Sequence, residues 1–131
     1  MTCIDSDVII DFLRKKRVAQ ELLASIEIRE GTLCTTAINS FEVFKGVARH
    51  TNSEKYRAVA EFLTRLTIFD LTFEISKKAA EIHEDLKLKG QVIDTGDILI
   101  AATVIANNET LLTRNTKHFK RIPGLKLEPF P

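Results

Sequence analysis

The sequence predicts an α/β fold, a three-layer α/β/α sandwich around a central parallel sheet of about five strands. Two observations predict it. Short apolar or β-branched segments alternate along the chain with longer segments of helical spacing, and such alternation produces parallel strands joined by right-handed crossovers. The chain has 131 residues, of which 44% are hydrophobic, so it is long enough for a substantial core. We expect one domain over residues 1–131, with helices on both faces of the sheet.

In the first half of the chain, strands and helices are expected in alternation. In order they are a strand at 2–4, a helix from about 7 to 14, a helix at 18–29, a strand at 32–36 and helices at 37–50 and 53–66. Gly31 is expected to end the second helix, because glycine adopts the left-handed conformation that closes a helix. Ser53 is expected to cap the last helix, because its hydroxyl can accept a hydrogen bond from a free N–H group.

The second half of the chain continues the alternation. The expected elements are a strand at 67–72, an amphipathic helix at 73–90 that ends at Gly90, an apolar helix at 96–108, a strand at 110–113 and a short strand around 125–127. The helix at 96–108 is rich in alanine and apolar on all sides, so it is expected to be buried on most sides.

Composition excludes some classes of function. The net charge is only +1, which does not indicate a nucleic-acid binder. No apolar run approaches the roughly 18 residues of a membrane span, and the first residues show no secretion signal. Cys3 and Cys34 lie in apolar or β-branched runs, so we expect two buried thiols in a reducing cytoplasm, too few for a metal–thiolate site.

Three aspartates accompany the first strand. Asp5 directly follows it, so it is expected at the carboxyl edge of the sheet, where open α/β sheets form their sites, and it is hard to explain as a helix cap. Asp7 stands where the next helix begins, which favours an N-cap over a ligand. Asp11 lies one turn further on and is expected to face solvent.

Further polar side chains are expected at the same edge. Glu42 lies between apolar residues on the helix that leaves the strand at 32–36. Asp97 opens the apolar helix at 96–108, either as a cap or as a functional acid, and Asp94 is the alternative cap. Asn115 follows the strand at 110–113.

Carboxylates from Asp5, Glu42 and Asp97 in one crevice would repel each other and raise their pKa values. A divalent cation cancels that repulsion. Because the available ligands are oxygen atoms, the pattern indicates Mg²⁺ or Mn²⁺ rather than zinc. Such a site can position a phosphodiester and activate a water for in-line attack.

Three motifs carry a resemblance to a known family. They are "IDSDVIID", "TTAINSFEVFKG" and "GDILIAATVIANNETLLTRNTKHFKRIPGLKLE". In order and spacing they resemble the PIN-domain ribonucleases of the VapC toxin type, over essentially the whole chain. The resemblance implies a PIN-like fold with Asp5, Glu42 and Asp97 as the acidic triad around the metal.

The resemblance also assigns auxiliary residues. Ser6 matches the family's hydroxyl beside the first acid. Asp7 stands where the family usually has asparagine, and Asn115 stands where many members have a fourth aspartate. An amide at position 115 brings no charge, which weakens a second metal position.

The expected function is a Mg²⁺-dependent endoribonuclease, the toxin half of a toxin–antitoxin pair. The resemblance implies that cleavage leaves 5′-phosphate and 3′-hydroxyl ends. Arg114, Lys117 and Lys120 are expected to hold RNA phosphates. The resemblance implies a homodimer and a cognate antitoxin. Two alternatives stay open: a haloacid-dehalogenase-like phosphatase, suggested by "DSD" after the first strand, and a non-enzymatic RNA- or protein-binding module.

Overall fold

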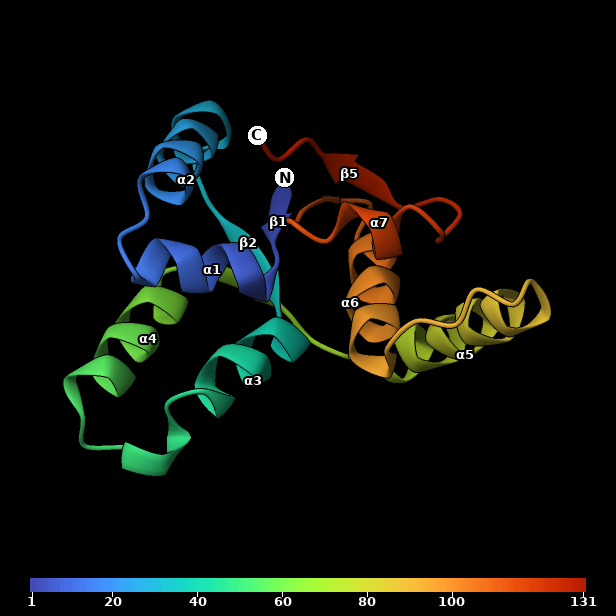
Figure 1. Cartoon of the computed structure of the whole chain (residues 1–131), viewed down its shortest axis with the longest axis horizontal. Coiled ribbons are helices and arrows are strands. Elements are labelled where there is room, and N and C mark those ends of the chain that lie inside the picture. The colour runs from blue at the N-terminus through green and yellow to red at the C-terminus, as the bar shows by residue number, and fades with distance from the viewer.

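The centre of the fold is a sheet of five parallel strands in the order β3-β2-β1-β4-β5, seen in a computed structural model that describes residues 1–131 (Figure 1). The strands are β1 (Thr2–Ile4), β2 (Cys34–Thr36), β3 (Thr67–Phe69), β4 (Thr110–Leu112) and β5 (Lys126–Glu128). The chain builds outward from β1 to β3, then crosses to place β4 on the other side of β1. The strand order therefore reverses between β1 and β4, which is where open α/β sheets form their sites. The predicted fold class is confirmed.

Helices fill both faces of this sheet. They are α1 (Ser6–Leu13), α2 (Arg17–Glu30), α3 (Ala37–Lys45), a 3₁₀ turn η1 (Ala48–His50), α4 (Glu54–Thr64), α5 (Phe73–Leu88), α6 (Thr95–Ala106) and α7 (Thr116–Phe119). None of them combines the length and the apolar composition needed to cross a membrane. In Figure 1, α1 to α4 lie to one side of the strands, and α5, α6 and α7 lie to the other.

The strands separate two hydrophobic clusters, because successive side chains of a strand point to opposite faces. Cys3, Cys34 and Leu111 pack against α5 and α6, whereas Ile4 and Leu112 pack against α1 to α4. The prediction of buried thiols is confirmed, since Cys3 and Cys34 are fully buried with their sulfur atoms 3.0 Å apart.

Most predicted boundaries differ from the structure by no more than two residues, but two differ by more. The predicted helix at 37–50 is wrong in its second half, because α3 ends at Lys45, before Gly46, a residue that weakens a helix, and the chain continues to the 3₁₀ turn η1. The predicted strand at 67–72 ends at Phe69, because the Thr72 side chain instead caps α5 by accepting a hydrogen bond from the Ile75 N–H at 3.2 Å. The predicted caps hold elsewhere: Ser53 caps α4, and Gly31 closes α2 at a φ of +80°.

Three helices end with the same backbone arrangement, in which one residue takes the left-handed conformation. These residues are Lys15 after α1, Gly90 after α5 and Asn108 after α6, at φ values of +61°, +67° and +54°. The residue that follows each one donates its N–H to a carbonyl five positions back, as Lys16 does to Asp11 at 3.0 Å. Glycine and asparagine adopt this conformation at low cost, but lysine does not. Lys15 is therefore a strained position.

Replacing Lys15 with glycine is expected to raise the free energy of unfolding, by up to about 1 kcal/mol, because glycine has no Cβ to oppose the left-handed conformation. Urea unfolding of Lys15→Gly and Lys15→Ala measures it. The alanine variant is the control, since it removes the side chain but keeps the Cβ. A glycine variant no more stable than the alanine variant would contradict the interpretation.

Candidate active site

Asp5 lies at the end of β1, beside the end of β4, and the residue is only 6% exposed. Its Oδ1 accepts hydrogen bonds from the Ser6 N–H and from Asn39 Nδ2, both at 2.8 Å, and its Oδ2 accepts one from Thr113 Oγ1 at 2.6 Å. The expectation that Asp7 caps α1 is wrong, and so is the expectation that Asp5 does not. Asp5 occupies the N-cap position and Asp7 follows in the first turn.

Two of these donors, Asn39 and Thr113, were not predicted from the sequence. The orientation of Asn39 is set by Thr36, the N-cap of α3, whose Oγ1 accepts from the Asn39 N–H at 3.2 Å and donates to Asn39 Oδ1 at 2.8 Å. The amide nitrogen is thereby turned toward Asp5. A threonine followed three residues later by a polar side chain is a capping pattern, so the sequence signals the cap but not this second contact.

Thr113, the other missed donor, ends the run "TLLT" and is fully buried. The register pairs Ile4 with Leu112, so the next residues on the two strands, Asp5 and Thr113, come to lie side by side. The Asp5 N–H also donates to the Leu112 carbonyl at 2.9 Å. Only the pairing of β1 with β4 identifies Thr113 as a site residue.

Glu42 is joined to Asp5 through Ser6. The Ser6 hydroxyl donates to Glu42 Oε1 at 2.5 Å and accepts from Asn39 Nδ2 at 2.9 Å. The other carboxylate oxygen of Glu42 lies against α6, 3.3 Å from the point where a Cβ on Gly96 would stand. Glycine at position 96 therefore leaves room for Glu42 beside the start of α6.

Asp97 follows in the first turn of α6 and is half-buried. Burial raises its pKa above the ordinary value, and the negative charge of Glu42 is the next largest cause, while the charge of His118 opposes the rise. Asp94 occupies the N-cap position but makes no side-chain capping bond. The three acids therefore influence one another in pairs: the charge of Glu42 raises the pKa of Asp97, and the charge of Asp97 is a smaller cause of the raised pKa of Asp5.

The aspartates beside β1 are poorly compensated. Burial, followed by the charge of Asp7, raises the pKa of Asp5 to about 7, although the hydrogen bonds from Thr113 and Ser6 oppose the rise. Burial likewise raises the pKa of Asp7, whose Oδ2 accepts from the Arg114 N–H at 3.0 Å. Its Oδ1 is buried with no hydrogen-bond partner. With the side chains as they lie, no three His, Cys, Asp or Glu groups are close enough together to hold a metal ion.

The remaining predicted residues lie on the segment after β4. The Asn115 N–H donates to Thr113 Oγ1 at 3.0 Å, and its amide nitrogen lies 3.1 Å from His118 Nδ1. Lys117 and Lys120 are exposed on and after α7, and no carboxylate lies within salt-bridge distance of either.

Arg114 and Asp11 form an ion pair that the sequence did not predict. The Arg114 guanidinium donates to Asp11 Oδ2 at 3.0 Å. The prediction that Asp11 faces solvent is wrong, because the residue is only 7% exposed. The physical reason is its pairing with Arg114 and with Lys16, whose Nζ lies 3.4 Å from Asp11 Oδ1.

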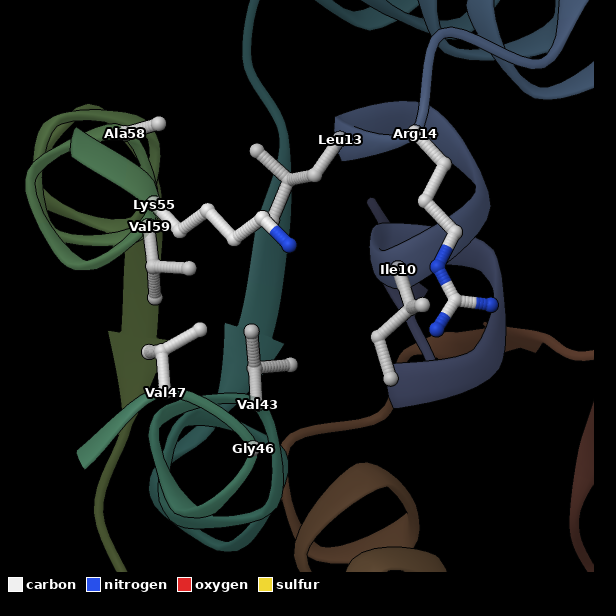
Figure 2. A pocket seen from close by; sticks show the side chains of 9 residues that line it. All are labelled: Ile10, Leu13, Arg14, Val43, Gly46, Val47, Lys55, Ala58 and Val59. Carbon is white, nitrogen blue, oxygen red and sulfur yellow. The ribbon is translucent and has the colours of Figure 1, made fainter. Parts of the chain in front are cut away.

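Two hollows open near these residues. An apolar hollow of about 280 Å³ lies between α1, α3 and α4, and Figure 2 shows the side chains of Arg14 and Lys55 at it. No acid of the candidate site lines this hollow. A broader hollow of about 500 Å³ is lined by Glu42, Gly96 and the exposed ring of Phe41. The second hollow therefore adjoins Glu42, whereas the first adjoins none of the three acids.

Comparisons with known proteins agree with this arrangement. Residues 2–125 match the PIN domain family. Ribonuclease VapC2 of Rickettsia felis is 38% identical over 109 residues, covering 82% of this chain and 78% of the relative. Ribonuclease VapC1 of Methanocaldococcus jannaschii is 31% identical over 126 residues, covering 95% of this chain and 84% of the relative.

Solved structures give the same result. The crystal structure of VapBC2 from Rickettsia felis bound to a DNA fragment from their promoter contains a chain that superimposes with a TM-score of 0.86 at 29% identity. The superposition covers 97% of this chain and 96% of that one. VapBC-1 from nontypeable Haemophilus influenzae superimposes with a TM-score of 0.80 at 25% identity, covering 98% and 97%. The chain therefore belongs to the PIN domain family and, within it, to the VapC ribonucleases.

Proposed function

We propose that this protein is a Mg²⁺- or Mn²⁺-dependent endoribonuclease, the toxin of a type II toxin–antitoxin pair, with Asp5, Glu42 and Asp97 as its catalytic acids. One observation carries the assignment of the site. Acidic side chains lie near the edge of the sheet where the strand order reverses, and the pKa values of Asp5 and Asp97 are raised there. Such a gathering opposes folding unless a cation compensates it, and perturbed carboxyl groups in a crevice are typical of functional sites.

The residues fit a hard divalent cation in their chemistry. The donors are carboxylate oxygens, as Mg²⁺ prefers, and the unpartnered Oδ1 of Asp7 adds further negative charge beside them. Asp5, Glu42 and Asp97 would hold the ion, with Asn115 as a neutral auxiliary ligand or water-positioning group. Side-chain rotations are needed, because Glu42 is turned toward Ser6 and both Asp5 oxygens already accept hydrogen bonds.

The chemistry that such a cation supplies is activation of a water and stabilisation of the charge that develops on the leaving oxygen. The residues of the chain do the positioning. Asn39 and Thr113 hold the Asp5 carboxylate at 2.8 and 2.6 Å, and Ser6 holds Glu42. Attack of water on phosphorus with the 3′ oxygen leaving gives 5′-phosphate and 3′-hydroxyl ends.

Lys117 and Lys120 are the proposed contacts to RNA phosphates. They follow the Asn115 end of the site, are exposed, and have no carboxylate partner that would compete with a phosphate. Arg114 is in a different position, because its guanidinium pairs with Asp11. It is therefore a weaker candidate for RNA binding than the two lysines.

The proposed partner is a cognate antitoxin, supported by solved relatives that are VapBC complexes. The hollow in Figure 2 is its candidate contact, because an apolar floor with Arg14 and Lys55 beside it suits a segment with apolar and acidic side chains. We also propose a homodimer, as the family resemblance implies, and a cytoplasmic location. The two free buried thiols agree with a reducing compartment.

The family match excludes one of the two alternative functions and leaves the other open. A haloacid-dehalogenase-like phosphatase is set aside by the match of residues 2–125 to the PIN domain family. A catalytically silent module that kept the fold is the remaining rival. Incubating the purified protein with total RNA, with and without Mg²⁺ and EDTA, separates them, because only the nuclease produces metal-dependent fragments.

Asp5→Asn, Glu42→Gln and Asp97→Asn are each expected to lower RNA cleavage by several orders of magnitude while the fold survives. In EDTA their melting temperatures should equal or exceed that of the wild type, because repulsion among the acids is relieved. Asp94→Asn is the matched control on α6, with cleavage expected to be close to wild type. Undiminished cleavage by any of the three variants would remove that residue from the catalytic set.

Without divalent cations, the free energy of unfolding is expected to fall as the pH rises. The folded pKa of Asp5, about 7, lies above the unfolded value of 3.8, so the folded state binds the extra proton. The associated stability is fully present below about pH 4 and is lost as the pH passes through about 7. Its upper limit is about 4 kcal/mol.

Urea unfolding between pH 4.5 and 8 in EDTA measures this slope for the wild type, Asp5→Asn and Asp85→Asn. The slope should shrink in Asp5→Asn and persist in Asp85→Asn, which removes a carboxylate from the surface of α5. Equal slopes in all three proteins would show that Asp5 does not titrate in this range.

Lys117→Glu combined with Lys120→Glu is expected to weaken RNA binding and to flatten its salt dependence, because each lost phosphate contact lowers the slope of log affinity against log salt by somewhat less than one. Fluorescence anisotropy with a labelled RNA in Ca²⁺ measures it. Lys87→Glu with Lys89→Glu, at the end of α5, makes the same charge change away from α7. If both double variants lose affinity equally, only net charge matters.

A further inference from the structure

Arg114 is held to α1 at two points, one on its backbone and one on its side chain. Its backbone N–H donates to Asp7 Oδ2 and its guanidinium donates to Asp11 Oδ2, both at 3.0 Å. Asp7 and Asp11 are one helical turn apart, so they lie on the same side of α1. The two carboxylates therefore fasten a single residue of the segment after β4 along that side of the helix.

Arg114 lies between Thr113 and Asn115, two residues at the candidate site. Thr113, before it, donates to Asp5 Oδ2 at 2.6 Å, and Asn115, after it, donates its N–H to Thr113 Oγ1 at 3.0 Å. The backbone torsion angles of residue 114 set the direction of both neighbours. A change in how Arg114 is held is thus transmitted to the hydroxyl that holds Asp5.

The Asp11 side chain is largely buried and paired with basic residues on both of its oxygens. It is 10% exposed, and its Oδ1 lies 3.4 Å from Lys16 Nζ at the start of α2. The Arg114 side chain is 48% exposed. A salt bridge with one such exposed partner adds little to global stability, so its main effect is expected to be local.

We propose that Asp11 and Arg114 are positioning residues for the ribonuclease reaction. Their ion pair holds the segment 113–115 against α1 and so keeps Thr113 in contact with Asp5. This inference rests on the proposed function of the site. It assigns Arg114 to the protein's own architecture instead of to RNA phosphate binding, and it gives a role to Asp11, whose side chain pairs with Arg114 and Lys16.

The test is a double-mutant cycle with Asp11→Asn, Arg114→Gln and the double variant, measured on a labelled RNA that the wild type cleaves in Mg²⁺. Each single variant should lower kcat about tenfold with KM changed less than about twofold, because a small misplacement of a catalytic group costs rate rather than affinity. The double variant should be no worse than either single variant, since both break one interaction. Arg114→Lys should restore part of kcat, because the single contact to Asp11 needs only one donor.

A readout independent of activity accompanies the cycle. Amide hydrogen exchange at Arg114 and Asn115 should be faster in both single variants, while the melting temperature changes little. Glu30→Gln is the matched control: Glu30 accepts from the Thr2 N–H and hydroxyl at the opposite end of β1, so its loss should leave kcat and these two amides unchanged.

Three results would overturn the proposal. A raised KM and a flatter salt dependence in Arg114→Gln, with Asp11→Asn unaffected, would make Arg114 a phosphate contact. Additive losses in the double variant would mean that the two residues act separately. If Asp11→Asn and Arg114→Gln lower the melting temperature strongly but leave kcat per folded molecule unchanged, the ion pair stabilises the fold and does not position the site. Wild-type protein that fails to cleave RNA would instead refute the proposed function. The amide exchange rates of Arg114 and Asn115 would still show whether the ion pair holds the segment 113–115 against α1.

Discussion

Burying the Asp5 carboxylate at the end of β1 costs several kcal/mol unless its oxygens find donors, and much of the site is organised around meeting that cost. The donors come from three parts of the chain: the first N–H of α1, the Asn39 amide on α3 and the Thr113 hydroxyl after β4. The hydrogen bonds do not compensate the charge fully, since the pKa of Asp5 is still raised to about 7. The residual imbalance is what makes the site suited to a cation.

The sheet topology explains how these donors meet. Because β4 returns to the central strand β1, Thr113 reaches Asp5 across a separation of 108 residues. The carboxyl ends of β1, β2 and β4 lie at one edge, so the helices that leave β1 and β2 bring Ser6 and Glu42 to the same place. The site is therefore a consequence of strand order, and the loops that carry it are short.

Helix α1 carries two aspartates in different environments, Asp7 beside the candidate site and Asp11 beside Arg114. Asp7 lies beside the acids with one oxygen unpartnered, whereas Asp11, one turn along, is matched by Arg114 and Lys16. Electrostatic imbalance is thus concentrated where a cation would bind and is relieved where it would not. The apolar hollow between α1, α3 and α4 is a separate feature, since none of the site acids lines it.

Much of this protein follows from the sequence alone, and the reason is that local patterns report local structure. The alternation of segments predicted the five parallel strands, and the position of Asp5 after the first strand placed it at the carboxyl edge. What the sequence could not supply is contact between distant segments. Asn39 looks like an ordinary residue in the first turn of a helix capped by Thr36, and Thr113 looks like a strand end, until β1 pairs with β2 and β4. Asp11 looks like a solvent-facing helical acid until Arg114, 103 residues away, folds against it. Burial and partner choice depend on which elements pack together, and only the tertiary structure decides that.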